Sequence, residues 1–314
     1  MRRLILVVGP PIIVAACYWL SMTGSNSGLA GLRASAQAGG MAEQVSVDEQ
    51  PTTLETLCQR KAQQLWPQLN RGCRIIVRPP YILAGDMSDD QLYRYHRNLI
   101  VPISRALSTS YFDRRPDEPI IVLIFSSQKQ YRDHALRLDR RRTANNYGYY
   151  QRSDRRIVLN IATGNGTLAH ELTHALAHFD FPALPKWFDE GLATVHEQCR
   201  FSEDRLQLEG LSNWRRHHLL AAIHSNRLET LKSLVVKASL ASEQTALDYA
   251  YVRYFCLYLQ HNRLLSPFYR KFRSAVDHDP TGIRTLQELL QVESLSVVDD
   301  DFRKWVKALG PRHR

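Results

Sequence analysis

Apolar residues in the first half of the chain follow two spacings, a helical period in some stretches and strand-like runs in others. Pro119–Phe125 is the clearest buried strand, because its apolar run is β-branched, aromatic and short. Pro102 predicts a kink or a break in the helix that contains it. The other predicted elements are helices at Leu54–Leu69, Ser88–Tyr111 and Gln128–Arg142, strands at Arg74–Val77 and Tyr81–Ala84, and a hairpin of Tyr147–Tyr150 with Arg155–Ile161.

The second half of the chain has mostly helical spacing. Thr167 is expected to cap a helix that continues to His178, and Pro182 ends it before a second helix over Lys186–Glu197. The later helical segments are Trp214–Asn226, Leu228–Lys237, Thr245–Gln260, Pro267–Val276, Arg284–Gln291 and Asp299–Leu309. We therefore expect an α+β protein with a mixed α/β N-terminal lobe at 51–200 and an all-helical C-terminal lobe at 201–314.

The first 50 residues predict export. Two arginines precede the apolar run Leu4–Leu20, which is the layout of a signal peptide or an uncleaved membrane anchor at residues 1–20. Residues 21–50 are rich in Gly, Ser and Ala and predict a flexible linker. Cleavage after Ala36-Gln37-Ala38 and lipidation at Cys17, in a lipobox-like context, both stay open. The expected location is the bacterial cell envelope, with a membrane or lipid tether as one alternative.

Composition indicates a folded body with a basic surface. The chain has 314 residues, of which 44% are hydrophobic and 23% charged, enough for one or two ordinary domains. Its net charge of +10 favours anionic partners, but no signature of specific nucleic-acid binding accompanies that charge. Cys58 and Cys73 are candidates for a local disulfide, with buried free thiols as the alternative. The lack of Cys-x-x-Cys spacing argues against a thiolate zinc site.

The candidate chemistry lies in the two helices at the centre of the chain. His170, Glu171 and His174 form a His-Glu-x-x-His motif. Residues four apart lie on the same helix face, so both imidazoles can face one ion, while the offset Glu171 can act as a base on a water molecule. The return of the second helix is expected to bring Glu190 beside the histidines. Two His and one Glu with an open fourth position form the ligand set of a catalytic zinc site.

The sequences HELTH at 170–174 and WFDEGLA at 187–193 together resemble the zinc peptidases called gluzincins, most of all the bacterial peptidase-MA-like proteins. The resemblance implies a zincin-like fold in which the active-site helix lies between the lobes. It also implies that His170, His174 and Glu190 bind Zn²⁺ and that Glu171 is the catalytic base.

The same resemblance suggests further roles. It implies that Tyr249 stabilises the oxyanion, although a packing role in its aromatic-rich helix is the alternative, and that Ile157–Ile161 is the edge strand along which an extended substrate lies. The sequence departs from some gluzincins at Thr194, where they carry an acidic residue that orients a ligand histidine. Asp189, Glu197 or a backbone carbonyl are the alternatives for that role.

One other residue near the motif competes with Glu190 for the place of the third ligand. Asp180 stands where a different zincin geometry has its third ligand, but Ala177 occupies the position at which that geometry needs a turn-forming glycine. His178 continues the helical row of histidines and is expected to be a packed or a ligand-supporting residue.

The basic run Arg140-Arg141-Arg142 either steers an anionic substrate or is solvated surface.

The sequence thus predicts a zinc-dependent metallopeptidase that acts on peptide or protein substrates. The first alternative is a non-catalytic, zinc-stabilised binding protein of the cell envelope. A second alternative is an envelope-binding protein that acts through its arginines, with the motif incidental. The last reading predicts no stoichiometric zinc and a strongly salt-dependent affinity for acidic polymers.

Overall fold

The computed structural model describes residues 53–142, 147–237 and 245–310. The predicted export segment 1–20, the linker 21–50, Cys17 and the Ala36-Gln37-Ala38 site lie outside the described residues. Among the helices in the described ranges, none combines the length and the apolar character needed to span a bilayer. The fold below is therefore that of these three ranges.

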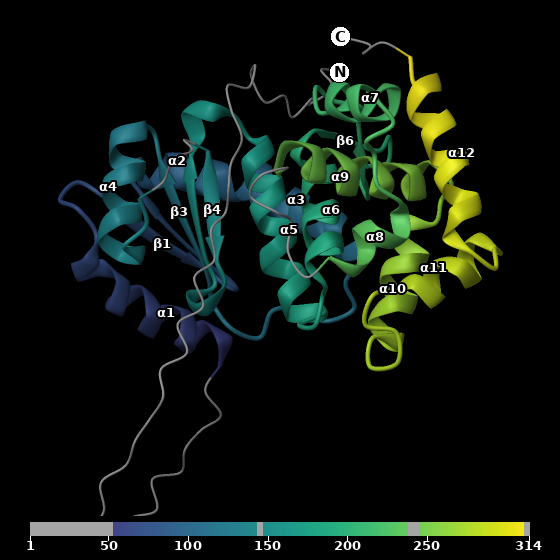
Figure 1. Ribbon diagram of the computed structural model, residues 1–314. Coiled ribbons are helices and arrows are strands. Elements are labelled where there is room, and N and C mark those ends of the chain that lie inside the picture. The colour runs from purple at the N-terminus through teal and green to yellow at the C-terminus, as the bar shows by residue number, and fades with distance from the viewer. Residues whose placement is uncertain (1–52, 143–146, 238–244, 311–314) are drawn as a thin grey trace, which may run out of the picture.

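A five-stranded mixed sheet forms the N-terminal lobe (Figure 1). Its strands are β1 (Arg74–Arg78), β2 (Tyr81–Gly85), β3 (Ile120–Phe125), β4 (Gly148–Gln151) and β5 (Arg156–Asn160), in the order β1-β2-β3-β5-β4. The three inner strands are parallel, and the two outer strands run antiparallel to their neighbours. The prediction that Ile157–Ile161 is the edge strand is wrong, because the turn at Arg152–Asp154 folds β4 back along the outer side of β5.

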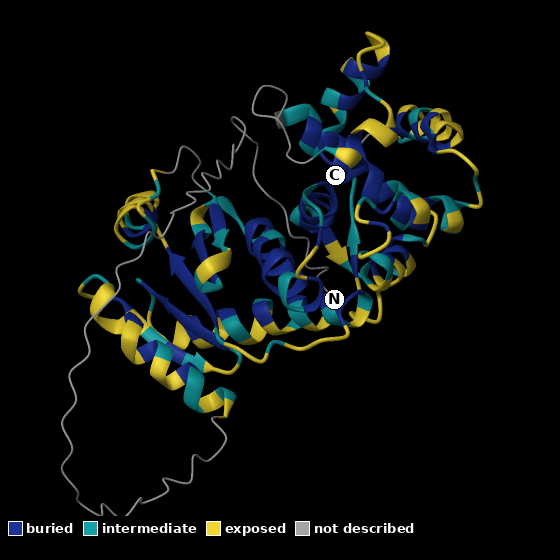
Figure 2. Ribbon diagram, turned by 60° about the horizontal axis from the view of Figure 1, so that its bottom comes forward, coloured by how far each residue is buried: buried dark blue, intermediate teal, exposed yellow. Residues whose placement is uncertain are grey.

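Helices cover both faces of this sheet (Figure 1). The even-numbered side chains of β3 join a cluster shared with α2, α3 and α5, and the odd-numbered ones join α1 and α4. Figure 2 shows the inner strands as buried, which explains why β3 has a continuous apolar sequence. These helices are α1 (Leu54–Leu65), α2 (Asp89–Tyr95), α3 (Val101–Ser110), α4 (Gln128–Asp139) and α5 (Gly166–Asp180), with short 3₁₀ turns at Trp66–Gln68, Arg152–Asp154 and Ile161–Thr163.

The helix predicted over Ser88–Tyr111 is interrupted. A π-helical turn, His96–Ile100, separates α2 from α3. Pro102 stands in the first turn of α3, directly after this π-helical turn. The interruption therefore lies just before the proline.

The His-Glu-x-x-His motif and Glu190 lie on two helices joined by a short connection. α5 begins at Gly166, so the prediction of Thr167 as its N-cap is wrong: Asn165 holds the cap position and Thr167 is buried in the first turn. α6 (Lys186–Glu197) has the predicted bounds. Because α6 packs between α5 and the C-terminal lobe, nearly all of its side chains are buried.

The C-terminal lobe is mostly helical, and the α+β class predicted from the sequence is confirmed. It differs from the prediction in a two-stranded hairpin of β6 (Cys199–Phe201) and β7 (Leu208–Gly210), directly after α6. Strands of three residues are too short for an alternating pattern to reveal them. The helices are α7 (Arg216–His224), α8 (Leu231–Val236), α9 (Thr245–His261), α10 (Leu265–Ala275), α11 (Ile283–Leu290) and α12 (Leu295–Ala308).

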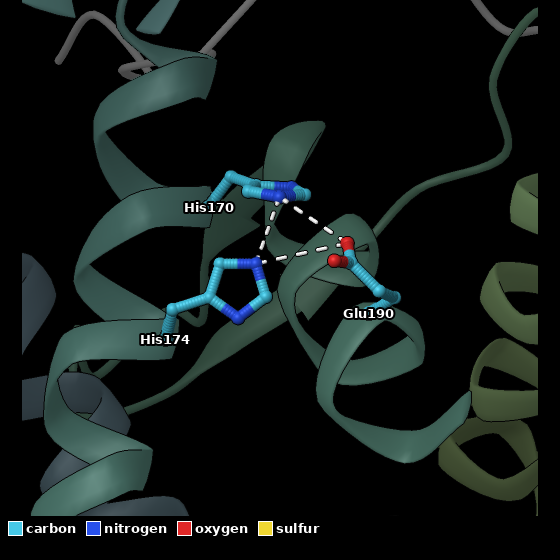
Figure 3. A group of neighbouring side chains, drawn as sticks. All are labelled: His170, His174 and Glu190. Atoms are coloured by element: carbon cyan, nitrogen blue, oxygen red, sulfur yellow. Dashed lines mark hydrogen bonds and ion pairs between the residues drawn. The ribbon is translucent and has the colours of Figure 1, made fainter. Parts of the chain in front are cut away.

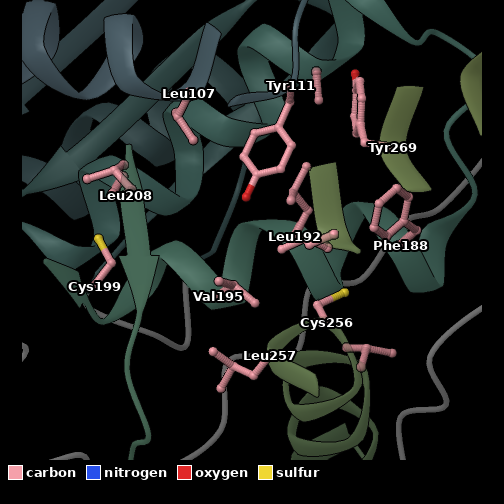
Figure 4. Packing of buried hydrophobic residues seen from close by; sticks show 14 of the residues in the cluster. Leu107, Tyr111, Phe188, Leu192, Val195, Cys199, Leu208, Cys256, Leu257 and Tyr269 are labelled. Atoms are coloured by element: carbon pink, nitrogen blue, oxygen red, sulfur yellow. The ribbon is translucent and has the colours of Figure 1, made fainter. Parts of the chain in front are cut away.

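One hydrophobic cluster runs from the sheet through α5 and α6 into the C-terminal lobe. Figure 4 shows Leu192 and Val195 of α6 beside Cys256 and Leu257 of α9. A Cβ atom added to Gly191 would lie 2.6 Å from Cys256 Sγ, so α6 and α9 approach each other as closely as a glycine permits. The position of α6 is therefore set by both lobes.

The four cysteines among the described residues are all buried and free. Cys58 and Cys73 lie in the cluster between the sheet and α1 and α4. Burial raises the pKa of the Cys58 thiol to about 11, and Cys73 Sγ lies 3.9 Å from His134 Nε2. Of the two readings of this pair, the structure has the buried free thiols.

Candidate metal centre

His170, His174 and Glu190 point at one position between α5 and α6 (Figure 3). His170 Nε2 lies 3.1 Å from His174 Nε2, and Glu190 Oε2 lies 3.7 Å from each of these nitrogens. A tetrahedral zinc ion with ligands at about 2.0–2.1 Å would separate its ligand atoms by roughly 3.3–3.4 Å. The three predicted ligands therefore meet, and the spacing of their donor atoms fits a zinc ion closely.

The two imidazoles differ in exposure and in charge. The side chain of His170 is 17% exposed, whereas those of His174 and Glu190 are 8% and 3% exposed. Burial and the neighbouring His174 lower the pKa of His170 to about 4, so its imidazole is neutral at neutral pH. Burial also acts to lower the pKa of His174, but the carboxylates of Asp189 and Glu190 outweigh it and raise that pKa well above 6.5. His174 thus holds a proton that a bound metal would displace.

Asp189 orients His174 from the ring nitrogen that faces away from the metal position. Its Oδ1 lies 2.5 Å from His174 Nδ1, and its Oδ2 lies 3.3 Å from His178 Nε2. A metal-binding histidine usually donates its other N–H to a carboxylate in this way, which fixes the ring and its tautomer. Asp189 therefore fills the role left open at Thr194, whose hydroxyl donates instead to backbone carbonyls of its own helix.

Lys186 holds the second oxygen of Glu190. Its Nζ lies 2.7 Å from Glu190 Oε1, which leaves Oε2 directed at the imidazoles. Burial acts to raise the pKa of Glu190, but Lys186 and the imidazoles lower it overall and keep the carboxylate charged. The sequence reasoning missed Lys186, although a lysine four residues before a glutamate on one helix is a recognisable pair.

Glu171, the predicted base, is 7% exposed and lies on the same helix as the two histidines. Burial raises the pKa of its carboxyl to about 7 and is the largest influence on that pKa. The charge of His174 acts to lower the pKa, and the charge of Glu190 acts to raise it. A carboxyl group with this pKa can both accept and release a proton near neutral pH. Such a perturbed acid beside a metal-ligand cluster is typical of catalytic sites.

Tyr249, the predicted oxyanion donor, lies beside Arg215, whose guanidinium carbon is 5.6 Å from the centre of the tyrosine ring. Arg215 also pairs with Glu197 at 3.2 Å, and the charges of both groups influence the pKa of His170, after burial and His174. Tyr249 is therefore linked to the neighbourhood of the site through Arg215. Its catalytic role stays a prediction.

Asp180, the alternative third ligand, lies outside the group of converging donor atoms. Its carboxylate accepts hydrogen bonds from Asp113 N at 2.9 Å, Arg114 N at 2.7 Å and the Tyr269 hydroxyl at 3.0 Å, and pairs with Arg273. These contacts tie the end of α5 to α10. Asp180 thus has a structural role, and Glu190 supplies the third donor.

The edge strand β4 lies along the part of α5 that carries the motif. At its start, a Cβ atom on Gly148 would lie 2.8 Å from Thr167 Cγ2. Near its end, the ring of Tyr150 lies 5.6 Å from the ring of His178, for which the sequence left a packed or a ligand-supporting role open. Among the described strands only β5 pairs with β4, so the other edge of β4 has no strand partner beside the metal-ligand stretch.

A comparison of the chain with known proteins finds no protein-family model and no curated protein that matches it. The interpretation of the site depends on the donor atoms and their surroundings. Three donors stand at zinc spacing, His174 and Glu190 are each held from behind by a charged side chain, and a buried carboxyl with a raised pKa lies beside them. This arrangement can bind a divalent ion and move a proton next to it.

Proposed function

We propose that the protein is an exported zinc-dependent metallopeptidase of the gluzincin type. The observation that carries the proposal is the convergence of His170 Nε2, His174 Nε2 and Glu190 Oε2 at separations of 3.1–3.7 Å. Two His and one Glu are the ligands of zinc peptidases that keep a fourth position for water or substrate. Export is supported by the basic and apolar pattern of the first 20 residues.

Glu171 is the group that moves the proton. Its carboxylate takes a proton from the water molecule that attacks the scissile carbonyl and gives it to the leaving amine. In the metal-free chain, burial raises the pKa of this carboxyl to about 7, so the group can take up and release a proton near neutral pH. A zinc ion held by His170, His174 and Glu190 would supply the complementary chemistry, since it would polarise the carbonyl oxygen and lower the pKa of water to about 7.

The substrate backbone is proposed to bind along β4. An extended peptide can add to an exposed sheet edge through main-chain hydrogen bonds. β4 is the outer strand next to α5, and its contacts at Gly148 and Tyr150 bracket the stretch of α5 that carries the two histidines. The role assigned to Ile157–Ile161 by the gluzincin likeness therefore passes to Gly148–Gln151.

Zinc content and peptide turnover of matched variants test the proposal. We expect Glu190→Ala to lose most of its zinc and Asp180→Ala to keep it. Glu171→Gln should keep zinc and lose turnover of a mixed peptide library by about 10²–10⁴-fold. Full turnover by zinc-loaded Glu171→Gln would exclude the mechanism. Stoichiometric zinc without any turnover by the wild type would favour the non-catalytic binding protein.

A further inference from the structure

Two arginines flank the edge strand β4. The guanidinium carbon of Arg141 lies 4.4 Å from the centre of the Tyr149 ring, on the sheet face that α1 and α4 cover. Arg152 follows β4 directly and donates through Nη2 to the carbonyl of Pro182 at 2.7 Å, in the connection between α5 and α6. One cation thus approaches the strand from each side.

Neither cation is neutralised by the rest of the described chain. Arg141 and Arg152 form no ion pair with a described carboxylate, whereas the neighbouring acidic groups are already engaged. Asp139 and Asp154 both pair with Arg156, and the hydroxyl of Tyr149 also donates to Asp139 at 2.5 Å. The surroundings of β4 therefore carry net positive charge.

Two carboxylates beside the candidate metal position are also already paired. Glu190 is held by Lys186, and Asp189 is held by His174 and His178. A ligand lying on β4 consequently meets two arginines that form no ion pair within the described chain, and the acidic residues beside them, Asp139 and Asp154, are already paired.

We propose that Arg141 and Arg152 make the β4 edge selective for peptides with Asp or Glu side chains near the position of the scissile bond. The inference rests on the proposed function, and it narrows the substrate class to acidic peptides. A peptide laid along β4 projects alternate side chains to the two faces of the sheet, and one arginine lies on each side. It also gives a function to Arg141 of the basic run that the sequence left open as steering group or solvated surface.

Peptide binding tests this selectivity without requiring turnover. The probes are two fluorescein-labelled decapeptides that differ only in having four Glu or four Gln residues, and the protein is the zinc-loaded Glu171→Gln chain. An exposed ion pair contributes about 0.2–1 kcal/mol to binding. Each arginine should therefore raise the affinity for the Glu peptide over that for the Gln peptide by about 1.4- to 5-fold. We therefore expect the Glu peptide to bind about 2- to 25-fold more tightly, as measured by fluorescence polarisation, and the ratio to fall when salt is raised from about 0.05 to 0.5 M.

Variants at the two arginines identify the source of the selectivity. Arg141→Gln with Arg152→Gln should bring the affinity ratio close to one, and replacing both by Lys should retain most of it. Arg60→Gln is the matched control, because it removes the same charge from an exposed position on α1, on the sheet face away from α5. It should leave the ratio unchanged.

The outcomes separate this inference from the peptidase proposal. Equal affinities for the two peptides, or a ratio that survives the double Gln substitution, would overturn the acidic preference. Cleavage of the Gln peptide by the wild type without charge preference would leave the peptidase proposal intact and remove this inference. Charge-selective binding with no cleavage of either peptide would support the acidic preference and remove the peptidase proposal.

Discussion

Asp189 is expected to control zinc affinity although its carboxylate faces away from the metal position. Asp189→Asn keeps the shape of the side chain but removes a negative charge that lies 2.5 Å from His174 Nδ1 and 3.3 Å from His178 Nε2. Loss of such a supporting group costs about 10–100-fold in metal affinity, or about 1.4–2.7 kcal/mol. Because the side chains of His174 and Asp189 are each only 8% exposed, solvent screens the interaction weakly and we expect the upper half of that range.

The assay is a competition titration of the metal-free protein with zinc and a chromophoric chelator at neutral pH, alongside the melting temperature of the metal-free form. Asp180→Asn is the matched control, since it changes an equally buried carboxylate on α5 that binds Arg273 and Tyr269 and makes no contact with the zinc ligands. It should lower the melting temperature and leave zinc affinity unchanged. A zinc Kd for Asp189→Asn within twofold of wild type would refute the reasoning.

Three further predictions follow from the packing and charges of the site. Gly191→Ala places a Cβ 2.6 Å from Cys256 Sγ. This overpacking should destabilise the fold by about 1–3 kcal/mol and lower the Tm measured by calorimetry by roughly 2–12 °C. An unchanged Tm would show that α6 and α9 separate freely. Zinc affinity should rise with pH until the raised pKa of His174 is passed, because binding expels that proton; titrations that level off at 6.5 would contradict this. Tyr249→Phe should lower kcat about 10²–10³-fold with zinc content unchanged, whereas undiminished kcat would assign the tyrosine to packing against Arg215.

Elements with strong local signals were predictable from the sequence. Lys186–Glu197 has the bounds of α6 because Pro185 precedes it and no helix-breaking proline interrupts it. β3 was predictable because a strand buried on both faces needs a continuous apolar run. The edge position of β4 and the short β6–β7 hairpin were not, since strand order and the pairing of three-residue segments depend on contacts between distant parts of the chain.

Some features of the candidate site were likewise predictable from the sequence, and others were not. Convergence of His170 and His174 follows from helical spacing alone, and the short connection to α6 makes Glu190 the natural third donor. The choice among Asp189, Glu197 and a backbone carbonyl as support for His174 could not be made from spacing. It depends on the rotation of α6 about its own axis, which its packing against both α5 and the C-terminal lobe determines.

That rotation connects the fold to the metal centre. Asp189 and Glu190 are consecutive residues and point about 100° apart around α6, yet Asp189 meets Nδ1 of His174 while Glu190 Oε2 lies near its Nε2. A small rotation of α6 would therefore misplace the ligand and its supporting carboxylate together. Because Gly191 fixes the approach of α6 to α9, the C-terminal lobe sets the geometry of the proposed zinc site as much as α5 does. A substitution at this helix contact should thus weaken zinc binding without altering any ligand.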